Sequence, residues 1–147
     1  MKKTDFLTAK GTLGIVLTDE NGNLKQELNV TNLVVDTGLA YIASRMKDAT
    51  ATAMTHMAIG SGTTDPAAAD TALQTQLGRV SLTSTTVTNN SVAYIASFAA
   101  GTGTGAVTEA GIFNASSAGT MLCRTEFAVI NKAAGDSMTI TWTVTVE

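Results

Sequence analysis

The chain has 147 residues and a mass of 15.1 kDa, the size of one domain with one hydrophobic core. Nine Lys and Arg against twelve Asp and Glu give a net charge of -3, and charged residues make up 14% of the chain, against about 25% in an ordinary soluble domain. The lack of a basic stripe argues against a nucleic-acid partner, and the lack of a long apolar run argues against a membrane span or a signal peptide. A single cysteine excludes a disulfide scaffold and a cysteine-based zinc site.

The first elements expected along the chain are an arm and a β-hairpin. Met1–Lys10 contains three lysines and no strong strand pattern, so we expect an extended N-terminal arm over 1–10 and a single domain over 11–147. Leu13–Leu17 alternates apolar and other residues and leads to Asn21-Gly22, a pair favoured in type I′ hairpin turns. The returning strand is expected over Leu24–Val35.

Two helices are expected to interrupt the strands. Asp36 or Thr37 can cap a helix whose buried stripe includes Leu39 and Ile42, and a shorter helix is expected from Asp70 or Thr71 to Gly78. His56–Gly60 is expected to form a strand between them.

The rest of the chain predicts further strands. Asn89-Asn90 can form a hairpin turn because asparagine tolerates positive φ, and it joins Val80–Thr88 to Ser91–Ala99. The strongest alternation is over Ser137–Val146, where apolar residues share one face and threonines the other. Two more strands are expected over Val107–Phe113 and Met121–Ile130. The pattern as a whole is mainly β and predicts an antiparallel β-sandwich of about seven strands with one or two short helices at an edge. The predicted core comprises Leu39, Ile42, Ile59, Ile112, Phe113, Phe127, Ile140 and Trp142.

Residue types that could carry chemistry occur singly. His56 is the only histidine and is expected at a strand edge, and Cys123 alternates along a strand as a small buried residue would. Gly60-Ser61-Gly62 lacks the lysine of a nucleotide-binding loop, and Asp19 to Asn23 lacks the ligand spacing of a calcium loop, so a crossover and a hairpin turn are expected instead. Glu109 is an isolated mid-strand carboxylate, expected to accept backbone or arginine hydrogen bonds. We therefore predict no catalytic residue, no cofactor and no metal site, and hence no enzyme.

Four segments follow one another along the chain: Asn32 to Leu39, Met57 to Thr64, Asp70 to Arg79 and Thr108 to Phe113. In this order they resemble segments of small virion structural proteins of tailed bacteriophages. The second to fourth segments are also similar to the N-terminal part of tail-collar fibre proteins, in which an xxIGxG turn, a DTAL helix and a TExGIF strand follow one another. No repetitive shaft or coiled coil follows up to Glu147, so the resemblance implies the attachment module alone.

The resemblance implies a structural role in the virion, with the protein made in the host cytoplasm. The favoured role is a capsid decoration (cement) protein that binds the head lattice as a homotrimer or other homo-oligomer; the alternative is a tail, neck or collar component at a fibre base. The expected partners are other virion proteins, such as the major capsid protein, with no nucleic acid and no membrane. A row of threonines is uncharged and can be buried against a neighbour without desolvating ions. The predicted interface residues are Lys2, Lys3, Phe6, Thr139, Thr141 and Thr143.

A host-glycan-binding module is the less favoured alternative. Glycan sites usually present exposed aromatic side chains, and aromatic residues make up only 5% of this chain. Tyr41, Tyr94 and Trp142 lie on periodic apolar faces, where core packing is the expected role.

Overall fold

The computed structural model describes residues 7–47 and 51–147, which form nine β-strands and one α-helix. The elements, in chain order, are β1 (Ala9–Thr18), β2 (Leu24–Val34), α1 (Asp36–Ser44), β3 (His56–Gly60), β4 (Gln76–Ser81), β5 (Ser84–Thr88), β6 (Ser91–Phe98), β7 (Gly105–Phe113), β8 (Met121–Lys132) and β9 (Ser137–Val146). The mainly β prediction is confirmed. No helix in this part of the chain is long and apolar enough to cross a membrane.

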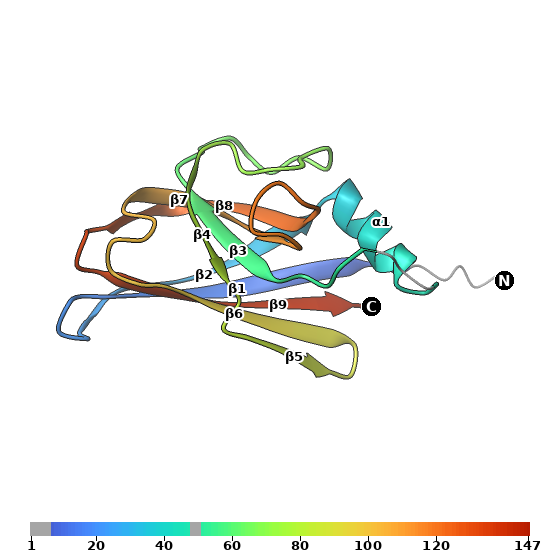
Figure 1. Cartoon of the computed structure of the whole chain (residues 1–147), viewed down its shortest axis with the longest axis horizontal. Helices are drawn as coiled ribbons and strands as arrows, with labels where there is room; N and C mark the ends of the chain where they lie inside the picture. Colours follow the sequence, from blue (N-terminus) through green and yellow to red (C-terminus); the bar gives the residue numbers. More distant parts are fainter. Residues whose placement is uncertain (1–6, 48–50) are drawn as a thin grey trace, which may run out of the picture.

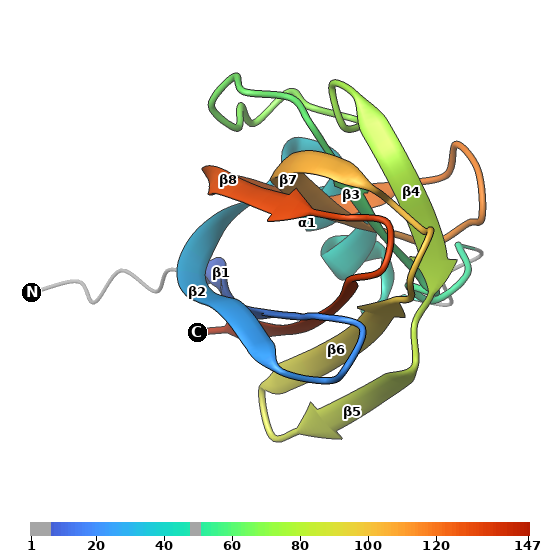
Figure 2. The same ribbon diagram turned by 90° about the vertical axis from the view of Figure 1, so that its left-hand side faces the viewer.

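The strands form a single antiparallel sheet that curls into a half-barrel, and not the expected sandwich of about seven strands. The strand order is β4-β3-β7-β8-β2-β1-β9-β6-β5, and the curl is visible end-on in Figure 2. β2 pairs with β1 along most of its length but with β8 only through Leu33 and Val34. The sheet folds over at this narrow junction, so its two halves face each other as two sandwich layers would (Figure 1). Sequence periodicity reports which face of a strand is buried and not whether two layers are joined at an edge.

The core lies between the two halves of the curled sheet. One half contributes buried residues of β1, β6 and β9, and the other contributes buried residues of β3, β7 and β8. Six of the eight predicted core residues are buried: Ile59, Ile112, Phe113, Phe127, Ile140 and Trp142.

Several local predictions are confirmed by the strand pairing. β1 and β2 form the hairpin around Asn21-Gly22, β5 and β6 form the hairpin around Asn89-Asn90, and β9 has the predicted bounds. The turn at Asn21-Gly22 is not type I′, however, because only Gly22 has a positive φ. The predicted arm overlaps β1, which begins at Ala9. Thr8 also exchanges two backbone hydrogen bonds with Glu147, at 2.7 and 2.8 Å.

The helix predicted from Asp70 or Thr71 to Gly78 is wrong. Residues 70–75 form no helix and are irregular, with bends at 72, 74 and 75, and β4 begins at Gln76. The backbone N–H groups of Gln74 and Thr75 donate to the Glu109 carboxylate, so a distant side chain takes the donors that a helix would use internally. Leu73 and Leu77, which set the helical spacing, pack in two different apolar clusters.

The strand predicted over Val80–Thr88 is broken into β4 and β5. Leu82 donates its backbone N–H to Thr55 at 2.8 Å, and Thr83 donates to Ile95 at 2.7 Å. Thr55 lies directly before β3 in one half of the sheet, and Ile95 lies on β6 in the other half. The chain therefore passes from one half of the sheet to the other between Leu82 and Thr83.

α1 lies where expected, but its cap and its buried side differ from the prediction. The N-cap residue is Val35, without a side-chain cap, and neither Asp36 nor Thr37 serves as the cap. Leu39 is 46% exposed and Ile42 is half-buried, so the prediction of Leu39 as a core residue is wrong. The buried residue of α1 is Gly38, which lies against the backbone of Leu122 in β8. The helix therefore rests on the sheet through a glycine, which gives no hydrophobic signal in a sequence.

Candidate functional site

The predicted interface threonines lie on the outer face of β1, β9, β6 and β5, which we call the hydroxyl face. No residue of β5, β6 or β9 is charged, and β1 contributes only Lys10, which pairs with Glu147 at 2.8 Å. The register places side chains of alternating residues from the four strands next to one another. The hydroxyl-bearing residues of this face are Thr12, Thr18, Ser84, Thr86, Thr88, Ser91, Ser97, Ser137, Thr139, Thr141, Thr143 and Thr145.

Thr139, Thr141 and Thr143 lie on β9, which is flanked by β1 and β6. Thr141 is exposed, and Thr139 and Thr143 are half-buried between their neighbours. Thr139 forms a hydroxyl–hydroxyl bond with Ser97 at 3.3 Å, and Thr145 forms one with Ser91 at 2.8 Å. Neighbouring side chains thus satisfy part of the face's hydrogen-bonding capacity without ions. The other predicted interface residues, Lys2, Lys3 and Phe6, lie outside the described residues.

The hydroxyl face ends at the edge strand β5. All five of its residues, Ser-Thr-Thr-Val-Thr, are exposed, and its inward-facing Val87 is 69% exposed. β5 has no charge and no proline, and its pairing with β6 has no register shift, so it lacks the features that usually prevent an edge from pairing with another strand. β4, at the opposite edge of the sheet, carries the charged Arg79.

The outer face of the other half of the sheet is covered by the loop 61–75. Glu109, at 0% exposure on β7, accepts backbone N–H bonds from Gly62 and Thr75 on Oε1 and from Gln74 on Oε2. Arg124 of β8 donates to Oε2 through Nε at 3.0 Å and Nη2 at 2.9 Å. We call this set of contacts the loop clamp.

Arg124 extends the loop clamp further along the loop. Its Nη1 donates to Asp70 Oδ2 at 3.0 Å, and its Nη2 donates to the Thr64 carbonyl at 3.0 Å. Burial alone would raise the pKa of Glu109, but the N–H groups of Thr75, Gln74 and Gly62 and the Arg124 guanidinium outweigh it, and the pKa lies below its usual range. Glu109 is therefore ionised at neutral pH and holds the loop in place.

Glu109 accepts hydrogen bonds from both of the predicted kinds of donor, the backbone and an arginine side chain. The sequence did not indicate which residues would supply them. Arg124 was not among the predicted site residues. In the structure it lies opposite Gly111 in the β7–β8 register, two residues along β7 from Glu109. The xxIGxG, DTAL and TExGIF segments meet in the loop clamp through Gly62, Asp70 and Glu109.

The local roles predicted for Asp19, His56 and Cys123 are observed, whereas Gly60-Ser61-Gly62 leads into a loop between the neighbouring antiparallel strands β3 and β4 and not into the expected crossover. Asp19 accepts hydrogen bonds from the backbone N–H and side-chain amide of Asn23 and from the N–H of Asn21 in the β1–β2 turn, and these bonds lower its pKa. His56 begins β3 and lies beside Thr55 and Ser81. Cys123 is fully buried, and burial raises the pKa of its thiol. Within residues 7–47 and 51–147, no three His, Cys, Asp or Glu side chains come together in a metal-binding arrangement.

Comparison with known proteins yields no relative. No family model, no curated protein and no solved structure matches the chain.

Proposed function

We propose that this chain is a non-enzymatic structural protein of a tailed-bacteriophage virion, most simply a capsid decoration protein that binds the head lattice as a homo-oligomer. The observation that carries the proposal is the hydroxyl face, which is broad and free of charged side chains over three adjacent strands. Burying such a face against another virion protein desolvates hydroxyl groups, some of which already have neighbouring partners, whereas burying ions would cost far more. The order of the phage-like segments supports a virion protein.

In this proposal the hydroxyl face meets the lattice through Thr139, Thr141 and Thr143. Lys2, Lys3 and Phe6 add contacts from the N-terminal arm to a neighbouring subunit. The virion surface is then where the protein acts after synthesis in the host cytoplasm.

A tail, neck or collar component at a fibre base is the second candidate. It is favoured by the loop clamp, because the three segments similar to tail-collar fibre proteins build that one structural unit. Gold-labelled antibody on purified virions distinguishes the two, since it marks the head surface in one case and the tail or neck in the other. Labelling of neither part would contradict both.

The glycan-binding alternative has less support. Trp142 is fully buried and Tyr94 is 7% exposed, so neither offers a flat outer surface to a sugar. A glycan array with no reproducible signal is the expected result.

A lysine at the centre of the hydroxyl face is expected to weaken attachment to the virion. Thr141→Lys replaces an exposed side chain, so unfolding should change by less than about 0.5 kcal/mol. Binding should fall at least about tenfold, because the interface would have to bury an unpaired charge. Co-sedimentation with particles that lack the protein measures the loss. Thr71→Lys, an exposed threonine on the opposite side, is the matched control, and equal binding by both variants would contradict the assignment of the face.

Self-association is expected to use the β5 edge. Thr86→Lys places a charge at the middle of this exposed strand, where lysine discourages strand addition. Light scattering should show the wild-type chain as an oligomer and the variant shifted towards monomer, with thermal unfolding of the separated monomer little changed. A wild-type chain that stays monomeric at high concentration would contradict the homo-oligomer, and an unchanged variant would contradict the β5 edge as its interface.

A further inference from the structure

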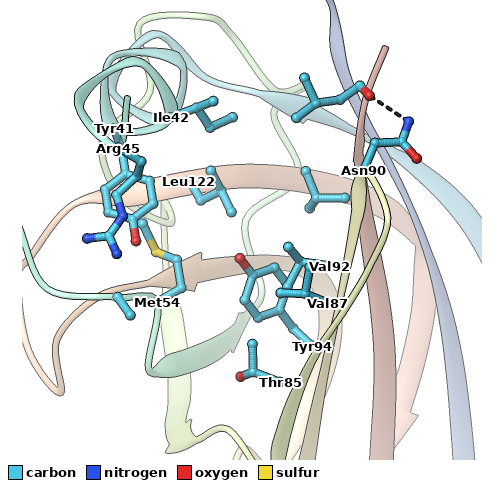
Figure 3. Close-up of a pocket in the computed structure, with 13 residues that line it drawn as sticks. Tyr41, Ile42, Arg45, Met54, Thr85, Val87, Asn90, Val92, Tyr94 and Leu122 are labelled. Atoms are coloured by element: carbon cyan, nitrogen blue, oxygen red, sulfur yellow. Dashed lines mark hydrogen bonds between the residues drawn. The ribbon is translucent and has the colours of Figure 1, made fainter. Parts of the chain in front are cut away.

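An apolar pocket opens at one end of the half-barrel, between α1 and the β5–β6 hairpin. Its volume is about 330 Å³, and Figure 3 shows side chains from α1, β5, β6, β8 and the segment before β3 converging on it. We call it the α1 pocket. Ligand sites in proteins are commonly cavities of about 300 to 1,000 Å³ with mostly apolar walls, and the mouths of curled sheets are a frequent location. The apolar wall includes Ile42, Met54, Val87, Val92, Leu122 and Val144.

Two tyrosines add polar groups to this apolar wall. Tyr94 is 93% buried as a residue, yet its hydroxyl points towards the centre of the pocket (Figure 3). Among the lining residues, Asn90 Nδ2 donates a side-chain hydrogen bond to the Val146 carbonyl at 2.7 Å, and no lining residue forms a hydrogen bond with the Tyr94 or Tyr41 hydroxyl. Burial, with Tyr41 and Cys123 nearby, raises the pKa of Tyr94 to about 12. At neutral pH the hydroxyl is therefore a proton donor without a partner in the wall.

Among the residues that the structure describes, Arg45 is the only charged residue that lines the α1 pocket. Its guanidinium lies 5.8 Å from the centre of the Tyr41 ring, and its Nη1 donates to the Ala51 carbonyl at 3.1 Å. No described carboxylate forms an ion pair with it. The pocket thus combines an apolar floor with a positive charge and two hydroxyl donors.

We propose that the α1 pocket binds a small monocarboxylate with an apolar tail, the tail against the apolar wall and the carboxylate at Arg45 and the tyrosine hydroxyls. The volume sets the ligand's size, since a cavity of about 150 Å³ holds benzene and this one is about twice as large. The charge of Arg45 sets the class of the ligand, because a guanidinium and two hydroxyls can donate to a carboxylate, whereas the guanidinium would repel a cation. This binding activity goes beyond the structural role proposed above and does not depend on it.

Isothermal titration calorimetry with octanoate, which has about ten non-hydrogen atoms, tests the proposal. We expect a dissociation constant on the order of 100 µM for the wild-type chain. Octan-1-ol, with the same tail and no charge, should bind several-fold more weakly. Arg45→Gln should remove most of the difference between the two probes, and Tyr94→Phe should weaken octanoate a few-fold while it keeps the ring in place.

Two variants on one strand locate the site. Val87→Trp fills the mouth of the pocket from a residue that is already 69% exposed, and octanoate binding should fall at least about tenfold. Thr88→Trp adds the same ring to the opposite face of β5 and should bind octanoate as the wild type does. The absence of octanoate binding, or equal binding by these two variants, would overturn the proposal. Equal affinity for octanoate and octan-1-ol would overturn the assignment of a carboxylate.

Discussion

Glu109→Gln is expected to lower the free energy of unfolding at neutral pH by about 3 kcal/mol, the cost of breaking a buried ion pair from one side. The variant has nearly the same shape, but its amide group cannot accept all the hydrogen bonds that the carboxylate receives from Arg124 and the loop backbone. Arg124 would keep Asp70 as its remaining carboxylate partner. In a chain of this length the loss corresponds to a melting temperature lower by roughly 10 °C, measurable by calorimetry or circular dichroism.

Glu126→Gln is the matched control, because Glu126 lies directly opposite Glu109 in the β7–β8 register but is partly exposed. We expect its melting temperature to remain within a degree or two of the wild type. If the two variants lose the same free energy of unfolding, the effect of Glu109→Gln comes from the loss of one charge, and the hydrogen bonds of the loop clamp do not stabilise the fold.

Acid titration gives a second readout of the same carboxylate. The pKa of Glu109 in the folded chain lies below its ordinary value of 4.5, so its ionisation stabilises the fold fully above pH 4.5. This contribution is lost as the pH falls from 4.5 through the lower pKa of the folded state. The difference in stability between the wild type and Glu109→Gln should therefore narrow with decreasing pH, and a difference that stays constant between neutral pH and about pH 3 would contradict the role of Glu109.

The part of the fold that could be predicted from the sequence is the part set by neighbouring residues. The alternation in Ser137–Val146 and the asparagine turns at Asn21 and Asn89 fixed two hairpins and the last strand, since strand faces and turns are decided over a few residues. The outward position of Thr139, Thr141 and Thr143 follows from the same alternation.

The remaining features depend on residues far apart in the chain. The segment from Asp70 to Gly78 resembled a helix because its own residues favour one, but the carboxylate of Glu109, 34 residues beyond Thr75, accepts the backbone N–H groups of Gln74 and Thr75. The curl of the sheet depends on the short pairing of Leu33 and Val34 with β8, and no local pattern encodes that pairing. The α1 pocket escaped prediction because Tyr41 and Tyr94 occupy periodic apolar positions, which look the same in a sequence whether a cavity or a side chain faces them.

Gly38→Ala is expected to destabilise the fold by about 2 kcal/mol, although alanine is the better helix former. In an open helix the change would stabilise by about 0.5 to 1 kcal/mol. At Gly38, however, the new methyl carbon would lie 1.9 Å from the Leu122 carbonyl oxygen and 2.7 Å from its carbon. These are backbone atoms of the central strand β8, so α1 has to move, and overpacking of this kind typically costs about 1 to 3 kcal/mol.

Gly135→Ala provides the matched control, because the same added methyl group would meet only the Glu20 side chain at ordinary contact distance, 3.4 Å. Its unfolding free energy should stay close to that of the wild type. Tyr41 and Ile42 of α1 and Arg45 at its C-terminal end line the α1 pocket. The shift of α1 in Gly38→Ala should therefore also weaken octanoate binding, whereas Gly135→Ala should leave it unchanged. If Gly38→Ala proves as stable as Gly135→Ala, the helix does not rest on β8 through this glycine. If Gly38→Ala is destabilised but binds octanoate as the wild type does, α1 does not form a wall of the α1 pocket.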